Sequence, residues 1–181
     1  MWWEGRRMFS LLTNFLFIQS LGVIALVLLI CAFNAKQRKR ILELQALEFI
    51  FFIIHYVLLL AYAGAVMCTI TLLRNLIFMK SDEKKWANHR LWLYVFILLS
   101  VATPLFFWEG WITLLPVIGV ILGTYSVSRK NPRELRGYML VAALVWIPYT
   151  IIVQSYPGLL SQIVAVGAIL SGMYRFDRTV K

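Results

Sequence analysis

The stretch from Ile41 to Met79 limits the folds open to this chain more than any other feature. It is 39 residues long and almost all apolar, and its ionisable and amide side chains are limited to Glu43, Gln45, Glu48, His55, Arg74 and Asn75. A single helix crosses the hydrocarbon core of a bilayer with about 20 apolar residues. The stretch is therefore too long for one crossing and predicts two crossings joined by a tight turn. The only turn chemistry inside it is Tyr62-Ala63-Gly64.

The composition agrees with a chain built for lipid. Of its 181 residues, 61% are hydrophobic and 14% are charged, and the mean hydropathy is +0.79. Such a chain predicts an all-α integral membrane protein whose main partner is the lipid bilayer. The net charge of +10 also suits nucleic-acid binding. The basic residues form short clusters between apolar runs, however, as in membrane proteins, so no nucleic-acid partner is expected.

Seven apolar runs predict seven transmembrane helices. The expected spans are 11–33, 44–61, 65–79, 91–108, 112–128, 137–155 and 159–173. With these spans, every Lys and Arg except Arg6 and Arg7 lies on one side of the membrane. The positive-inside rule makes that side cytoplasmic, which places the N-terminus outside and the C-terminus inside. Cys31 and Cys68 fall near opposite faces, so no disulfide is expected.

An internal repeat appears when the chain is shifted by 94 residues. The shift superimposes Tyr62-Ala63-Gly64 on Tyr156-Pro157-Gly158, and it pairs Lys36 with Lys130. We interpret both Tyr-x-Gly sites as the tips of helical hairpins. The two copies are separated by one span, so each enters the membrane in the same direction, which makes a parallel repeat.

The predicted organisation is two parallel three-helix repeats joined by a linker helix. Its parts are an N-terminal interfacial segment (1–10), the first repeat (11–79), a basic cytoplasmic loop with linker helix four (80–111), the second repeat (112–173) and a cytoplasmic tail (174–181).

This plan resembles the SWEET-like, or PQ-loop, architecture. The resemblance implies that prolines in the first two helices of each repeat act as hinges. The second repeat has Pro116 and Pro148, whereas the matching positions in the first are Gly22 and Ile54. The hinge candidates are therefore Gly22, Pro116 and Pro148, and half of the proline set is absent.

A closer resemblance is to the YgjV family of bacterial inner-membrane proteins. It is carried by Leu114-Leu115-Pro116-Val117-Ile118-Gly119 and by the series His55, Tyr62 and Arg74. It extends from about Gln19 to Phe176. The resemblance implies a multi-pass protein of the bacterial cytoplasmic membrane.

Ionisable and polar side chains within the spans are the candidate binding residues, because such groups are costly in hydrocarbon. Gln45, Glu48 and His55 share one face of span two. Their carboxylate and imidazole suit a polar cavity or a proton relay. The same face of the second copy carries Trp146 and Tyr149.

Span three adds Thr71, Arg74 and Asn75 to the candidates, and Glu48 lies at a depth suited to partner Arg74. A purely structural interpretation stays open for each of these residues. In that interpretation His55 bonds a carbonyl of a neighbouring helix, Glu48 and Arg74 reach the interface, and Trp146 packs in the core or against lipid.

The sequence lacks the motifs of catalysis. It has no metal-ligand cluster, no Gly-x-Ser-x-Gly, no phosphate-binding glycine loop and no pair of carboxylates in one span. We therefore expect no enzyme, no catalytic residue, no metal and no cofactor. The first hypothesis is a transporter that moves a small polar or amphipathic solute through a pocket between the two bundles, lined by spans one, two, five and six. The alternative is a non-transporting membrane scaffold or partner-binding protein. Either is compatible with a homo-oligomer.

Overall fold

The computed structural model describes residues 2–34, 38–80, 84–127, 129 and 131–174. Within them the chain is all-α, as predicted, with seven α-helices, two short 3₁₀ helices and no strand. The α-helices are α1 (Trp2–Asn34), α2 (Arg38–Leu58), α3 (Tyr62–Met79), α4 (Leu91–Phe106), α5 (Leu114–Val127), α6 (Pro132–Ile152) and α7 (Tyr156–Gly172). The 3₁₀ helices are η1 (Lys85–Asn88) and η2 (Trp111–Thr113).

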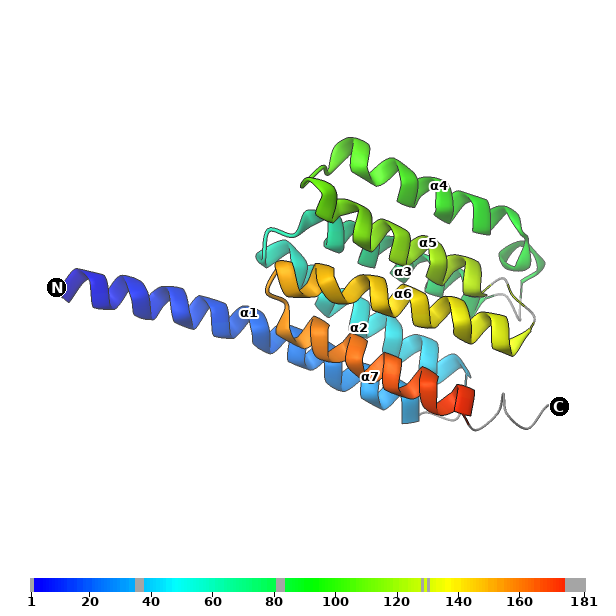
Figure 1. Ribbon diagram of the computed structural model, residues 1–181, viewed down its shortest axis with the longest axis horizontal. Helices are drawn as coiled ribbons and strands as arrows, with labels where there is room; N and C mark the ends of the chain where they lie inside the picture. The colour runs from blue at the N-terminus through cyan, green and yellow to red at the C-terminus, as the bar shows by residue number, and fades with distance from the viewer. Residues whose placement is uncertain (1, 35–37, 81–83, 128, 130, 175–181) are drawn as a thin grey trace.

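Six of the α-helices form a closed ring. Each packs against the next in the order α1, α2, α3, α5, α6 and α7, and α7 returns to α1. Helix α4 lies outside the ring against α3 and α5 (Figure 1). The ring therefore has an interior that α4 does not reach.

The side chains are distributed as a bilayer requires. Large apolar residues face outward, and Leu105 and Trp111 are each 81% exposed. Polar residues such as Ser100 and Thr113 are instead completely buried. Lipid tails can cover the apolar exterior, whereas hydroxyl groups within hydrocarbon need partners inside the protein. The fold is therefore that of a membrane protein.

Three helical segments of the described chain are long and apolar enough to cross a membrane. They are Asn14–Ala32, Tyr62–Met79 and Arg133–Ile152. Three shorter apolar segments are Leu91–Phe106, Trp111–Ser126 and Tyr156–Gly172. The total of seven crossings stays a prediction.

The orientation of the termini also stays a prediction, because it depends on the basic loops. Lys36 and Lys130 of those loops lie outside the described residues, as does the predicted cytoplasmic tail after Tyr174.

Helix α1 is longer than the predicted first span. Residues 2–10, expected as a separate interfacial segment, continue the same helix. Its 33 residues correspond to about 50 Å, against a hydrocarbon core of about 30 Å. The N-terminal part of α1 consequently extends past the other helices (Figure 1).

The hairpin turns lie three residues earlier than predicted, at 59–61 and 153–155. Tyr62 and Tyr156 begin helices α3 and α7 instead of forming the turns. The turns pass through Leu60 (φ 58°) and Gln154 (φ 55°), both in the left-handed region. Residues other than glycine rarely adopt that conformation, which is why a glycine was expected in each turn. The turns contain no glycine, and the predicted turn positions were wrong.

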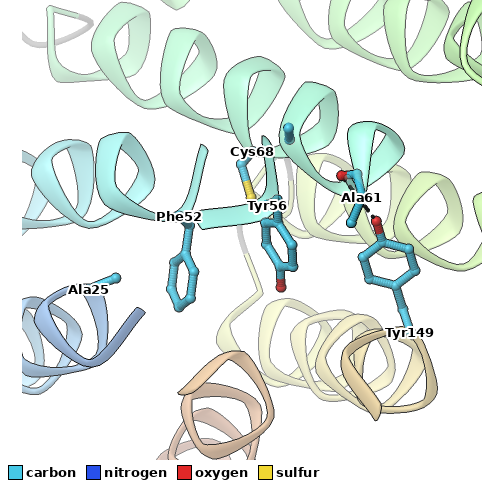
Figure 2. Packing of buried hydrophobic residues seen from close by; sticks show 7 residues of the cluster. Ala25, Phe52, Tyr56, Ala61, Cys68 and Tyr149 are labelled. Atoms are coloured by element: carbon cyan, nitrogen blue, oxygen red, sulfur yellow. Dashed lines mark hydrogen bonds between the residues drawn. The ribbon is translucent and has the colours of Figure 1, made fainter. Parts of the chain in front are cut away.

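Gly64 has a packing role in place of the expected turn role. A Cβ atom there would lie 2.5 Å from the hydroxyl oxygen of Tyr149 on α6. The Gly64 N–H donates to that oxygen at 2.7 Å, and the hydroxyl faces the Ala61 carbonyl oxygen at 3.5 Å. Figure 2 shows the Tyr149 hydroxyl pointing at Ala61. Glycine thus allows α6 to contact the start of α3.

The two hairpins share one geometry at a separation of 94 residues. Helices α2 and α6 begin at residues 38 and 132 and end at residues 58 and 152, and α3 and α7 begin at residues 62 and 156. The Ala61 N–H donates to the Tyr56 carbonyl at 2.9 Å, and the Ser155 N–H donates to the Thr150 carbonyl at 2.9 Å. The separation is the one at which the sequence repeats.

Helix α6 begins before the predicted start of span six. The Asn131 side chain accepts from the Arg133 N–H at 3.0 Å, and Pro132 occupies the first turn. An asparagine N-cap followed by proline is a typical helix start. Arg133 and Arg136, expected in a loop, therefore belong to α6.

Candidate functional site

A cavity of about 240 Å³ lies within the ring. All six ring helices contribute to its lining and α4 does not. Leu29 comes from α1, and Cys68 is one of the residues from α3. The predicted lining by spans one, two, five and six was incomplete, because α3 and α7 also take part.

Eight residues were predicted to bind a solute, and five of them line this cavity. They are Gln45, Glu48, Thr71, Arg74 and Trp146. The other three are buried but do not line it, and they are His55, Asn75 and Tyr149. The structure thus brings four polar residues of α2 and α3 together on the cavity, and Asn75 contacts one of them, Arg74.

Glu48 presents an unsatisfied carboxyl group to the cavity. Its side chain is 5% exposed, and Oε2 has no hydrogen-bond partner among the described residues. It lies ten residues before the end of α2, which is about 15 Å from the turn. An unpartnered polar group costs free energy when buried, so native proteins satisfy most such groups. Glu48 Oε2 is therefore open to a donor that enters the cavity.

Arg74 places a buried cation on the same cavity. Its Nη1 donates to Thr124 Oγ1 at 3.1 Å, and Nε and Nη2 face Asn75 Oδ1 at 3.4 Å each. The expected ion pair with Glu48 does not occur among the salt bridges of the described residues. Because a guanidinium has five N–H donors, Arg74 retains donors for a further acceptor.

The opposite wall is apolar. Met139, Ala142 and Trp146 line it from α6, at the positions that correspond to Gln45, Glu48 and Phe52 in the first copy. The Trp146 indole rests on α5 at Gly119, where any Cβ would overlap its ring. The cavity therefore has one polar and charged wall from α2 and α3 and one apolar wall from α6, and α7 adds Ser161 and Gln162 to its lining.

Four aromatic side chains separate the cavity from the turns, and we call them the aromatic floor: Phe52, Tyr56, Trp146 and Tyr149. Phe52 stacks on Tyr56 with ring centroids 5.9 Å apart, and Trp146 meets Tyr149 edge to face at 5.6 Å. Tyr56 bridges the two pairs, at 6.3 Å from Trp146 and 6.0 Å from Tyr149. Figure 2 shows Phe52 and Tyr56 next to each other, with Cys68 close to Tyr56.

His55 packs against Phe52 and Tyr56 of this floor, does not line the cavity, and has a hydrogen-bond partner at both ring nitrogens. Its Nδ1 is 2.8 Å from the Ile18 carbonyl oxygen, and its Nε2 is 2.8 Å from Ser155 Oγ. A carbonyl can only accept, so Nδ1 carries the proton, and a neutral ring then accepts the serine proton at Nε2. His55 thereby joins α1, α2 and the start of α7.

We call the end of the ring formed by residues 59–61 and 153–155 the turn end. His55 of α2 and Tyr149 of α6 are 94 residues apart in the sequence, and each bonds to the opposite hairpin. Gln19 adds a bond from Nε2 to the Gln154 carbonyl at 2.9 Å. Glu109 accepts from the Ala63 N–H at 3.0 Å. These long-range bonds close the turn end.

The three hinge candidates have different surroundings. Pro116 is buried in the first turn of α5, where a missing N–H removes no helical hydrogen bond. Pro148 is inside α6 and is exposed on its surface. A Cβ at Gly22 would lie 2.9 Å from Pro157 and 3.1 Å from His55 Cε1, so this glycine allows α1 to contact α7 and α2. Their hinge role stays a prediction.

Sequence reasoning missed several residues of this region. Thr124 binds Arg74, and Ser155 binds His55. Tyr56 and Cys68 line the cavity. Hydroxyl residues occur throughout the spans, and only the three-dimensional arrangement distinguishes these from the others.

The site contains no arrangement for a metal within the described part of the chain. No three His, Cys, Asp or Glu side chains gather there, and Cys31 and Cys68 are both free. The cavity suits reversible binding through charge, hydrogen bonds and aromatic contact.

Comparison with known proteins places the chain in a protein family. No curated protein matches the chain, and no solved structure does. A family model for Imp-YgjV, described as a bacterial inner membrane protein, matches residues 16–180. That match includes the whole ring from the cavity-facing part of α1 to α7. The chain therefore belongs to the Imp-YgjV family of bacterial inner membrane proteins.

Proposed function

We propose that this protein is a transporter that carries a small polar or amphipathic solute across the bacterial inner membrane. The observation that carries the proposal is the cavity at the centre of the ring, where Glu48 and Arg74 are buried without each other as partners. A scaffold would use its buried polar groups for contacts between helices. The scaffold alternative expects a closed bundle, and a cavity of about 240 Å³ favours transport.

The proposed architecture is seven crossings in two parallel three-helix repeats, α1–α3 and α5–α7, with α4 as the linker. The matching bounds of α2 and α6 and the matching turns support it. In this arrangement the turn end faces outward, the N-terminus is outside and the C-terminus is cytoplasmic. After the solute binds, movement of one repeat against the other would open the cavity to the other side of the membrane.

The conformation described above suits one stage of such a cycle. The bonds of His55 and Tyr149 seal the turn end, and the aromatic floor lies between that seal and the cavity. Opening the turn end requires that these bonds break while the other end closes. Pro116 and Pro148 are the proposed hinges for that movement. Pro148 interrupts the backbone hydrogen bonding inside α6, whereas Pro116 lies in the first turn of α5, next to the connection from α4.

Transport can be tested before the solute has been identified. Vesicles that contain the purified protein are exposed to the low-molecular-mass fraction of a bacterial extract, washed, and opened for mass spectrometry. We expect one or a few solutes to accumulate above the level in empty vesicles, and Arg74→Gln to abolish the difference. Accumulation that is equal in protein-containing and empty vesicles contradicts the proposal.

His55→Ala and Glu48→Gln separate the two polar regions in the same assay. Glu48→Gln should abolish uptake because Glu48 lines the cavity, whereas His55→Ala should retain the identity of the transported solute. Unchanged uptake in Glu48→Gln removes Glu48 from the site.

A further inference from the structure

The cavity carries information on the class of its solute. This step rests on the proposed function and specifies the substrate of the same site. Glu48 comes from α2 and Arg74 from the adjacent α3, and both side chains line the cavity. Glu48 is 5% exposed and Arg74 is 9% exposed, so water screens neither group well.

The two charges are complementary but separate. No described carboxylate forms a salt bridge with Arg74, and Glu48 Oε2 has no hydrogen-bond partner in the described part of the chain. Isolated buried charges are strongly unfavourable, and each is stabilised by an opposite charge close to it. A single molecule with both an anionic and a cationic group would satisfy both residues at once.

The rest of the lining selects the body of that molecule. Met139, Ala142 and Trp146 form an apolar wall, and Phe52 and Tyr56 cover the end nearest the turns. A polyol such as a sugar would leave the hydroxyl groups that face this wall without partners, even with Gln45, Thr71, Ser161 and Gln162 elsewhere in the lining. An aliphatic or aromatic body would instead bury apolar area there.

The volume limits the size. Sites for drug-sized ligands have volumes of roughly 300–1,000 Å³. The present cavity of about 240 Å³ is smaller. It therefore suits a compact molecule.

We infer that the solute is a small zwitterion with an apolar body, of the chemical class of the neutral apolar α-amino acids. Its carboxylate binds the Arg74 guanidinium, which has free donors beyond those used by Thr124 and Asn75. Its ammonium binds the Glu48 carboxylate. Its side chain lies against Trp146 and Met139.

Three related probes test each contact. L-leucine carries both charges, 4-methylpentanoate lacks the amine, and 3-methylbutylamine lacks the carboxylate. Binding is measured by calorimetry on the full-length protein in nanodiscs of phosphatidylglycerol alone, so that no zwitterionic lipid competes. We expect leucine to bind roughly 10- to 100-fold more tightly than either analogue, because each analogue leaves one buried charge unpaired.

Two variants assign the contacts and do not depend on absolute affinity. In Glu48→Gln, the preference for leucine over 4-methylpentanoate should disappear, while the preference over 3-methylbutylamine remains. In Arg74→Gln, the reverse should hold. Because each variant is compared with itself on three probes, a folding defect would appear as loss of all binding, and circular dichroism in the same nanodiscs identifies such a sample. If a variant fails in this way, the affinities of wild-type protein for leucine and the two analogues test the inference by themselves.

The inference is overturned if either analogue binds wild-type protein as tightly as leucine. It is also overturned if neither leucine nor L-phenylalanine binds. These outcomes are distinct from failure of the transport proposal. Specific leucine binding without uptake into vesicles would contradict the transport proposal and support the zwitterion site. Uptake of a solute that is not an apolar zwitterion would support transport and contradict the zwitterion site.

Discussion

The turn end and the cavity of this protein differ in whether their polar groups have partners within the protein. At the turn end, both ring nitrogens of His55 have partners, and the Tyr149 hydroxyl and Gly64 N–H bind each other. In the cavity, Glu48 retains a carboxyl oxygen with no hydrogen-bond partner in the described chain, and Arg74 has no carboxylate beside it there. The polar groups of the turn end are paired within the protein, whereas those of the cavity remain open to a further partner.

The contrast also separates the two hairpins, α2–α3 and α6–α7, whose positions match at a separation of 94 residues. His55 and Tyr149 are equivalent positions and perform the same task at the turn end. Glu48 and Ala142 are equivalent as well, yet only the first carries charge into the cavity. Symmetry is thus kept where the hairpins are joined and lost where a solute would bind. Four substitutions test this difference through their effect on the free energy of unfolding.

Gly64→Ala should cause the largest loss of stability. The new methyl group would lie 2.5 Å from the Tyr149 hydroxyl oxygen, and overpacking of this kind costs about 2–3 kcal/mol. Denaturation monitored by tryptophan fluorescence in detergent measures the change. Gly167→Ala is the matched control, because nothing lies within 4 Å of the added atom. Equal stability of the two variants would show that the turn end is loosely packed.

His55→Ala should cause the second largest loss. It removes two 2.8 Å hydrogen bonds and leaves the Ile18 carbonyl and the Ser155 hydroxyl without this partner. The expected cost is about 1–2 kcal/mol in the same measurement. Below the unfolding transition, leucine affinity should stay within a few fold of wild type. A stable variant that no longer binds solute would show that His55 takes part in binding.

Thr124→Val should have a smaller effect. The substitution keeps the side-chain volume and removes the 3.1 Å acceptor of Arg74 Nη1. We expect a loss of roughly 0.5–1 kcal/mol, because Asn75 and solute remain as acceptors. Titration calorimetry should show that leucine affinity falls by less than tenfold. A larger fall would mean that Thr124 itself positions the guanidinium for binding.

Glu48→Gln should cost no stability. The carboxyl oxygen that it replaces has no hydrogen-bond partner in the described chain, and a neutral amide is easier to bury than a carboxylate. The unfolding free energy is therefore expected to be equal to or higher than that of wild type, while uptake is lost. A marked loss of stability would indicate that Glu48 is a structural residue like His55.

The fold class and the general position of the candidate site could be predicted from the sequence. Apolar runs and basic clusters predict membrane helices, and the helical spacing of Gln45 and Glu48 places them on one face. Both line the cavity. The residue types alone contain this information, because polar groups are excluded from lipid unless they face inward.

The turns and the partners could not be predicted in the same way. Gly64 and Gly158 are of the residue type expected in turns, but in the structure they allow close packing. The left-handed conformation of the turns is instead adopted by Leu60 and Gln154. Which residue is strained in a turn depends on how the two helices dock. The absence of an ion pair between Arg74 and Glu48 among the described residues has the same origin, since similar depth in the membrane does not fix the distance between two side chains.

Access to the cavity from each side of the membrane is the most direct test of transport. Cys68 lines the cavity and is buried, and Cys31→Ser would leave it as the sole thiol. A charged, membrane-impermeant methanethiosulfonate is added to one side of oriented vesicles at a time, and labelling is measured by mass spectrometry against a denatured sample. We predict reaction of Cys68 from both sides, faster from the side opposite the turn end, and slower in the presence of leucine. Reaction from one side only, or none before denaturation, would contradict a cavity that opens to each side in turn.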